Sequence, residues 1–287
     1  MSHSTDHNTN PGPGATLFIA ASETDSNLYY ATKFIAPDPF IYLEVKGERL
    51  MIMSDLEVDR ARHQATVDRV VSYSELERRA KAQGVKDPGN IDVIHLVLHD
   101  AGVHEILVPP TFPFLHAQRL QELGYRLRTK RDPFYESRVV KSAEEVRHIE
   151  AAQRATEKAV AAAHESLRRA DIRDNVLWLD GEVLTSERVK KLINVALMEC
   201  DCVAQHTIVA GGERACDPHD EGSGPLPAHR SIIFDVFPRS ADSRYFADMS
   251  RTVVRGRPSP ELTKLYQTVK DAQEEAITKI RDGADGA

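Results

Sequence analysis

Short runs of strand-forming residues alternate with helical patterns in the first half of the chain, and this alternation constrains the fold more than any other feature. The strand-type runs cover residues 16–22, 40–45, 49–54, 67–73, 104–109 and 125–129. The helical patterns between them cover residues 74–82, 91–101 and 114–123, and each ends near a glycine. We therefore predict an α/β domain that ends near residue 135.

A second unit begins at Ser142. Glu145 follows it by three residues and completes a capping box, and apolar residues then recur at helical spacing as far as Leu167. Further helices are predicted over residues 187–198 and from Ser259, where a capping serine precedes a proline. Strand-type segments lie between these helices, over residues 203–211, 231–237 and 243–254.

These patterns divide the chain into three parts. Residues 1–14 contain no aliphatic side chain after the initiator methionine, so we expect a disordered tail. Residues 15–137 are expected to form the first domain and residues 138–287 the second, with a polar, proline-containing linker between them.

Composition excludes two classes of partner. No run in the 287 residues approaches the ~20 apolar residues of a membrane helix. A net charge of −7 without basic blocks disfavours nucleic acid. The three cysteines, Cys200, Cys202 and Cys216, are too few for a disulfide framework, and the apolar stretch 15–21 lacks the preceding basic residues of a secretory signal. We expect a cytoplasmic protein that contacts neither membrane nor nucleic acid.

Two aspartates interrupt otherwise apolar strand-type segments. A carboxylate buried in a strand is costly unless a positive group pairs with it. If residues 239–244 form a hairpin turn centred between Ala241 and Asp242, Asp235 and Asp248 face each other across the strands, with Cβ atoms about 5 Å apart. Such a pair suits two divalent ions about 3.5 to 4 Å apart. The alternative is that one aspartate faces solvent and the other pairs with an arginine.

Histidines supply the remaining candidates. His219 lies in a turn-rich loop and His206 in the strand-type segment before it, so either could shuttle a proton, bind a metal or be purely structural. His95 and His99 are four residues apart in a predicted helix, but the glutamate base of a metalloprotease helix is absent between them. The Cys-x-Cys spacing disfavours a zinc site, and the serine-hydrolase, phosphate-loop and dinucleotide patterns are absent.

Residues 206–256 resemble the core of the pita-bread metallopeptidases, which include aminopeptidase P, prolidase and creatinase. The shared features are a Thr-Ile-Val-x-x-Gly strand, a Pro-His loop, an apolar strand containing Asp, and a strand reading Asp-x-x-Arg-Thr. The helix opening RVVKSAEEVRHIEAA resembles the start of that catalytic domain, and SNLYYATKFIAPDPF resembles the creatinase-type N-terminal domain. The resemblance implies an α/β (α+β) fold.

The resemblance also implies a role for each candidate residue. Asp235 and Asp248 correspond to metal ligands, His219 to a catalytic histidine that contacts substrate, and His206 to a substrate-binding residue. The implied cofactors are two divalent ions, Mn²⁺ or Co²⁺, with Zn²⁺ as an alternative. The implied substrate is a peptide with proline at the second position, cleaved by metal-activated hydroxide, and a homodimer is the implied assembly.

The chain departs from the family pattern after Asp248. The family takes one more His and two Glu ligands from later strands, whereas residues 249–287 contain no His, and Glu274 and Glu275 are adjacent in a predicted helix. We therefore expect that the chain is truncated at its C-terminus, contains only the first part of the pita-bread domain and has no catalytic activity. One alternative is a creatinase-like amidinohydrolase, which shares the fold without needing a metal; the presence of both Asp235 and Asp248 argues against it. The other alternative is a noncatalytic pita-bread binding module.

Overall fold

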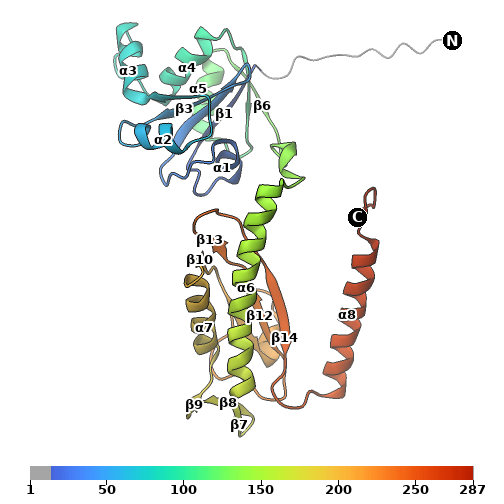
Figure 1. Cartoon of the computed structure of the whole chain (residues 1–287). Helices are drawn as coiled ribbons and strands as arrows, with labels where there is room; N and C mark the ends of the chain where they lie inside the picture. The colour runs from blue at the N-terminus through green and yellow to red at the C-terminus, as the bar shows by residue number, and fades with distance from the viewer. Residues whose placement is uncertain (1–13, 287) are drawn as a thin grey trace, which may run out of the picture. The chain divides into compact units, whose positions relative to one another are not determined.

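The structure is a computed structural model that describes residues 14–286 (Figure 1). The predicted tail, residues 1–14, lies outside the described residues except for Gly14. The chain divides into two compact units, one up to Val140 and the other from Lys141 onward. Each unit is described separately.

A six-stranded mixed sheet forms the centre of the first unit, with the strand order β4-β3-β2-β1-β5-β6. Strand β2 is antiparallel to both of its neighbours, and the remaining pairs are parallel. The strands are β1 (Ala15–Ala20), β2 (Phe40–Val45), β3 (Glu48–Met53), β4 (Arg69–Ser72), β5 (Glu105–Val108) and β6 (Arg126–Thr129). All six strand-type runs are therefore confirmed.

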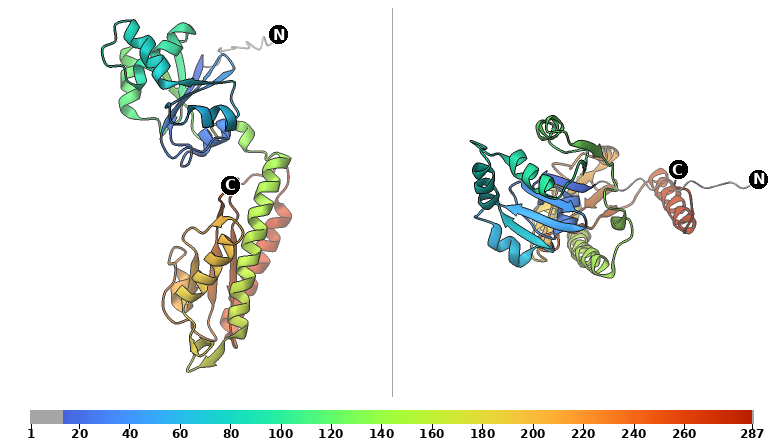
Figure 2. Two further views of the ribbon diagram at one scale, coloured as in Figure 1. Left: turned by 60° about the vertical axis from the view of Figure 1, so that its left-hand side comes forward. Right: turned by 90° about the horizontal axis from the view of Figure 1, so that it is seen from above.

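Helices cover both faces of this sheet (Figure 2). The helices are α1 (Ser26–Thr32), α2 (Val58–Gln64), α3 (Tyr73–Ala82), α4 (Asn90–Asp100), α5 (Phe114–Glu122) and the 3₁₀ helix η1 (Glu136–Arg138). Leu17 of β1 packs with residues of α3, α4 and α5, whereas the next residue, Phe18, packs on the opposite face with residues of α1 and α2. Burial of both faces explains why the central strands are apolar at successive positions.

Two helices of the first unit escaped prediction from the sequence. Helices α1 and α2 contain seven residues each and bury only two side chains apiece, so they lack a periodic apolar pattern long enough to recognise. Asp25 does cap α1, because its carboxylate accepts hydrogen bonds from the amides of Asn27 and Leu28 at 2.9 Å.

The second unit contains three longer helices and several short strands. The helices are α6 (Ala143–Arg169), α7 (Ser186–Met198), α8 (Pro260–Lys279) and the 3₁₀ helix η2 (Gly212–Cys216). The strands are β7 (Asp171–Arg173), β8 (Val176–Leu179), β9 (Glu182–Val183), β10 (Cys202–Val203), β11 (Ile208–Gly211), β12 (Ile232–Val236), β13 (Arg239–Ser240) and β14 (Met249–Val253). The capping box at Ser142 and the serine cap of α8 at Ser259 are both confirmed.

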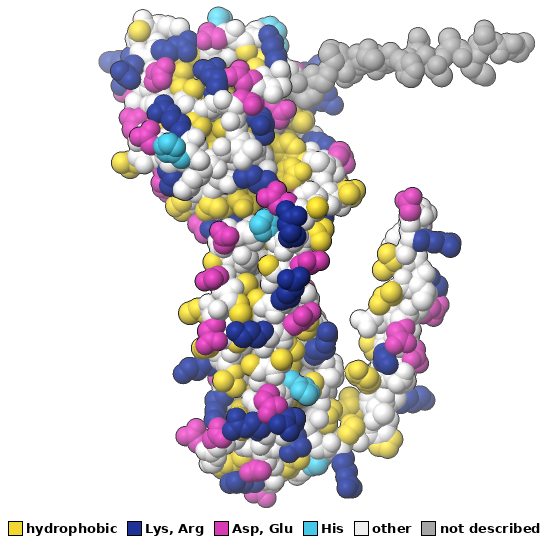
Figure 3. Space-filling view, in the orientation of Figure 1, with side chains coloured by type: hydrophobic (Ala, Val, Ile, Leu, Met, Phe, Trp, Pro, Cys, Tyr) yellow, Lys and Arg dark blue, Asp and Glu magenta, His cyan; other side chains and the backbone are white. Residues whose placement is uncertain are grey.

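A sheet of order β11-β12-β14 positions the predicted site residues. One face of this sheet packs against α6 and α7, where Phe234 of β12 is fully buried with Ala163 of α6 and Ile193 of α7. The other face bears Asp235. Helix α8 has no buried side chain, and Figure 3 shows hydrophobic side chains along it. In the part of the chain that the structure describes, no helix is both long and apolar enough to span a bilayer.

Candidate functional site

Asp235 is held on the middle strand of the three-stranded sheet. Strand β12 alternates between buried and half-buried residues, and Asp235 belongs to the half-buried set that faces away from α6 and α7. Its neighbour on β14 is Ser250, whose hydroxyl donates a hydrogen bond to Asp235 Oδ1 at 2.6 Å. This bond fixes one carboxylate oxygen and orients the group along the surface of the sheet.

Asp248 precedes β14 by one residue and reaches the same carboxylate. It lies two residues before Ser250, so the two-residue period of extended chain places both side chains on one face. The carboxyl group of Asp248 lies close to that of Asp235. Partial desolvation, the charge of Asp235 and hydrogen bonding between the two carboxyl groups raise the pKa of Asp248. The structure therefore brings together the two residues predicted as metal ligands.

The register between the strands differs from the predicted one. Asp235 pairs with Ser250 and not with Asp248, because the ladder continues through a bridge between Arg239 and Phe246. Strand β13 lies within this connection, and its residue Ser240 also pairs with Cys202 of β10. The turn is consequently centred one residue later than expected. A one-residue shift of the centre moves the register by two residues, which keeps both aspartates on the same face.

His206 is not in a strand, contrary to the prediction. It lies at a bend before β11 with φ of 46°, a left-handed conformation that interrupts extended backbone. Its Nδ1 lies within hydrogen-bonding distance of Glu221 Oε1, at 2.9 Å, and the side chain is 81% exposed. His206 and Glu221 line a hollow of about 500 Å³ beside α7, together with Lys190 and Asn194. The contact that the structure gives His206 is thus with Glu221 and not with the aspartates.

His219 lies on an exposed loop between η2 and β12. Its backbone amide donates to Asp217 Oδ1 at 3.0 Å, which closes a tight turn. The loop is fastened to β11 and α7 further on, where Val209 N–H donates to Glu221 O at 3.1 Å and Gly224 N–H donates to Glu187 at 3.0 Å. The contact that the structure gives His219 is made by its backbone amide, so the catalytic role assigned to its side chain stays a prediction.

The aspartate pair has donor chemistry that fits a divalent cation. Carboxylate oxygens are the ligands that Mn²⁺, Mg²⁺ and Ca²⁺ prefer, and the raised pKa of Asp248 shows that a second negative charge is unfavourable there without a counter-ion. Among residues 14–286, no third His, Cys, Asp or Glu gathers with the pair closely enough to form a larger ligand group. The described residues thus fit a divalent cation that is held by two protein ligands, Asp235 and Asp248.

The sequence analysis did not identify Ser250 and Glu221, which contact the candidate residues directly. Ser250 could have been found from its spacing, since a residue two positions after Asp248 in a strand lies on the same face. Glu221 carried no comparable signal, because its contact with His206 joins a loop to a bend.

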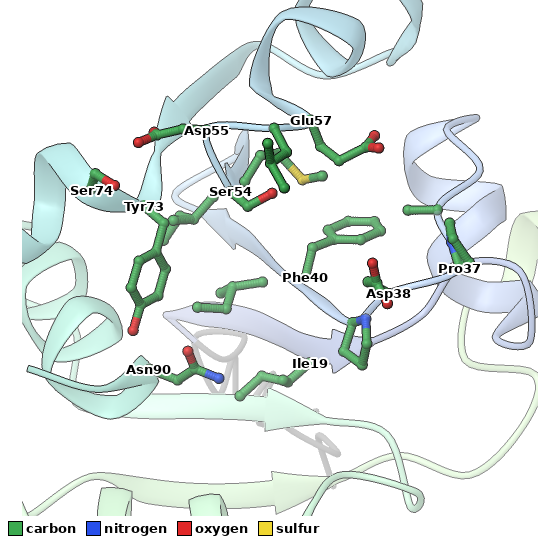
Figure 4. A pocket seen from close by; sticks show the side chains of 16 residues that line it. Ile19, Pro37, Asp38, Phe40, Ser54, Asp55, Glu57, Tyr73, Ser74 and Asn90 are labelled. Carbon is green, nitrogen blue, oxygen red and sulfur yellow. The ribbon is translucent and has the colours of Figure 1, made fainter.

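The first unit contains a separate cavity of about 390 Å³ at the ends of strands β1, β2 and β3 (Figure 4). Ile19 and Phe40 contribute apolar walls, and Ser54, Asp55 and Asn90 contribute polar groups. The carboxylate of Asp55 accepts hydrogen bonds from the hydroxyls of Ser72 and Ser74, which lower its pKa. This acid thus has a structural role at the start of α3, and no residue predicted for the site lines the cavity.

Sequence comparison relates the second unit to a peptidase family. Residues 147–287 match the family model of metallopeptidase family M24. The chain is 23% identical over 262 residues to an Xaa-Pro dipeptidase of Pyrococcus horikoshii, a match that covers 90% of this chain and 65% of that relative's length. It is also 23% identical over 268 residues to an uncharacterized peptidase of Staphylococcus saprophyticus, covering 91% of this chain and 68% of the relative.

Solved structures show the same fold. The chain matches an X-Pro aminopeptidase from Thermotoga maritima with a TM-score of 0.72 and 21% identity, over 94% of this chain and 70% of that one. It matches an Xaa-Pro dipeptidase from Bacillus anthracis with a TM-score of 0.73 and 16% identity, over 91% of this chain and 66% of that one. The α/β fold predicted from the resemblance is therefore confirmed.

Proposed function

Because the chain belongs, through residues 147–287, to metallopeptidase family M24, we propose that it is built to hydrolyse the peptide bond before proline with a divalent metal held by Asp235 and Asp248. The observation that carries the proposal is the contact between these two carboxylates on one face of the sheet. The Xaa-Pro dipeptidase and X-Pro aminopeptidase among the similar proteins support the choice of substrate.

The residues of this chain have distinct parts in the proposed site. Asp235, oriented by Ser250, and Asp248 hold the cation through carboxylate oxygens. When bound, a divalent ion supplies Lewis acidity toward the peptide carbonyl and toward water. His219 is proposed to contact the substrate from its exposed loop, and His206 is proposed to do so from the bend before β11. Mn²⁺ or Co²⁺ is the proposed ion, with Zn²⁺ as the alternative.

We propose further that this chain has little or no turnover by itself. Two carboxylates bind a divalent ion weakly, since stable sites for such ions use more protein ligands. Among the described residues, no additional His, Cys, Asp or Glu completes the group, and a base that could move a proton beside the two aspartates is likewise not gathered with them. A cytoplasmic location and a homodimer also remain predictions.

Release of proline from Xaa-Pro dipeptides, measured with Mn²⁺ or Co²⁺ added to the 287-residue chain, tests both proposals. We expect metal to bind while hydrolysis stays near background. Efficient hydrolysis that Asp248→Ala abolishes would show that two ligands suffice and would refute the proposed lack of turnover. Failure of Mn²⁺ and Co²⁺ to bind at all would contradict the metallopeptidase site itself.

A noncatalytic binding module is the second candidate. The contact of His206 Nδ1 with Glu221 Oε1, at 2.9 Å, favours it because it gives His206 a partner other than the aspartates. Equal affinity for an Xaa-Pro dipeptide in the wild type and in Asp235→Asn, without hydrolysis in either, would support this alternative.

A further inference from the structure

Two histidines of the first unit form a pair that the proposed peptidase site does not use. His95 and His99 are four residues apart on α4 and therefore lie on the same side of the helix. His95 is half-buried and His99 is exposed. Their imidazole rings lie 5.6 Å apart, centre to centre, with their planes tilted by 51°.

This ring separation suits two imidazoles that bind one ion. A metal–nitrogen bond of about 2.0 to 2.1 Å places each ring centre roughly 3 Å from the ion, so two rings that bind one ion at about 90 to 110° have centres about 4.5 to 5 Å apart. The observed separation is slightly wider. The i, i+4 spacing on the helix thus places both imidazoles within reach of one ion after a small side-chain rotation.

A tyrosine contacts one of the two rings. Tyr125 Oη lies 2.8 Å from His95 Nδ1, and 3.5 Å from the backbone carbonyl oxygen of His95. In the tautomer that carries its hydrogen on Nδ1, the ring donates this hydrogen to Tyr125, and the lone pair is on Nε2. This is the tautomer that we propose binds a metal, through Nε2.

A contact of this kind usually accompanies a metal-binding histidine. Such a ring generally donates its second N–H to a neighbouring group, which sets its orientation and increases its basicity as a ligand. Tyr125 is itself 7% exposed and packed in the core beside α4. The position of His95 is therefore fixed by its contact with a buried residue, while the exposed His99 has room to adjust and complete the pair.

From this geometry we propose that His95 and His99 form a surface site for one borderline transition-metal ion, Ni²⁺, Cu²⁺ or Zn²⁺, with water as the remaining ligands. Imidazole nitrogen suits these ions, and Cu²⁺ binds most tightly among them. The site differs in chemistry from the carboxylate pair of the second unit, because Mn²⁺ prefers oxygen ligands. Copper or nickel therefore occupies a position that manganese leaves free.

The test is a titration of the metal-free 287-residue chain with Ni²⁺ by calorimetry, and with Cu²⁺ by electron paramagnetic resonance. We expect one binding step whose Cu²⁺ spectrum shows hyperfine coupling to two imidazole nitrogens. His99→Gln should weaken this step more than roughly tenfold and leave one coupled nitrogen. Tyr125→Phe should keep both nitrogens and weaken binding roughly tenfold, as expected for loss of an orienting partner.

Matched controls separate this site from other histidines. His104 is exposed in the same unit, and His104→Gln should bind as the wild type does. The exposed position of His99 makes its substitution harmless to folding, which far-ultraviolet circular dichroism of the metal-free variants checks. Binding that is unchanged in His99→Gln, or a Cu²⁺ spectrum without two coupled nitrogens, would overturn the proposal.

Discussion

The carboxyl group of Asp248 lies beside that of Asp235, although the residue directly opposite Asp235 on the neighbouring strand is Ser250. The contact is diagonal across the ladder, and the Ser250 hydroxyl donates a hydrogen bond to Asp235 Oδ1 at 2.6 Å. Two like-charged groups in contact destabilise a sheet unless a proton or a cation lies between them. The geometry thus indicates a place for positive charge on a specific face of the sheet.

Replacement of Asp248 should remove most of the affinity for Mn²⁺. We expect Asp248→Asn to weaken Mn²⁺ binding about tenfold or more, equivalent to about 1.4 kcal/mol, because one of two anionic ligands is lost. Calorimetric titration of the metal-free chain measures this change.

The control for that measurement is Asp242→Asn. Asp242 lies in the nearby hairpin turn and is exposed, so its replacement alters the net charge equally without touching the pair. Equal affinities in the Asp248 and Asp242 variants would mean that Mn²⁺ responds only to the overall charge of the protein.

Gly222 should be intolerant of any side chain. Its φ is +77°, and a Cβ at this position would lie 1.9 Å from Val209 O of β11. We expect Gly222→Ala to lower the free energy of unfolding by about 3 kcal/mol or more, since a left-handed alanine costs about 1 to 2 kcal/mol and the overlap with backbone adds to it. Urea unfolding followed by circular dichroism measures the loss.

Gly224 provides the matched comparison two residues away. Its φ is +73°, but a Cβ there would meet nothing within 4 Å. Gly224→Ala should therefore cost only about 1 to 2 kcal/mol. If both variants lost the same stability, the close approach of the loop to β11 would not be a constraint on the fold.

Most strands and helices could be predicted from the local sequence pattern, whereas the site could be predicted only in part. Residues 40–45 coincide with β2, because its first four residues are apolar in succession and buried on both faces of the sheet. The capping signal at Ser142 likewise located the start of α6. The shared face of Asp235 and Asp248 was predictable because side chains alternate between the two faces of a strand. A register that is wrong by two residues therefore leaves each side chain on its predicted face.

Features that depend on contacts between distant segments were not predictable. Strand β13, within the connection between β12 and β14, pairs with the distant strand β10, and no local pattern encodes that pairing. His206 adopts a left-handed bend beside Glu221, whereas its sequence neighbourhood is typical of a strand. Tertiary contacts override local preference in both cases.

Glu187 should stabilise the loop of His219 in a pH-dependent manner. Its carboxylate accepts the Gly224 N–H, and this bond is the main reason why the pKa of Glu187 is lowered. A lowered pKa means that the stabilisation is present above the usual value of 4.5 and is lost as the pH falls through the pKa of the folded state. We expect Glu187→Gln to cost about 0.5 to 1 kcal/mol at neutral pH, because the group is exposed.

Urea unfolding at neutral and at acidic pH tests the Glu187 prediction. The difference between the wild type and Glu187→Gln should shrink toward zero in acid. Glu157 of α6 is equally exposed, and Glu157→Gln should leave stability unchanged at both pH values. A cost of Glu187→Gln that did not depend on pH would assign the effect to side-chain shape and not to charge.

Alkaline pH should destabilise the first unit through Tyr42. This residue is 1% exposed, and burial, followed by the charge of Glu44, raises the pKa of Tyr42 from 10.0 to about 12. Because the folded state holds the proton more tightly than the unfolded state, the stability is complete below pH 10 and is lost as the pH rises toward 12. A shift of this size corresponds to about 2 to 3 kcal/mol. Tyr42→Phe should reduce this loss of stability, as measured by denaturant unfolding at increasing pH. Tyr266→Phe on the exposed helix α8 is the control and should behave as the wild type. The same alkaline loss in both variants would show that burial does not oppose the ionisation of Tyr42.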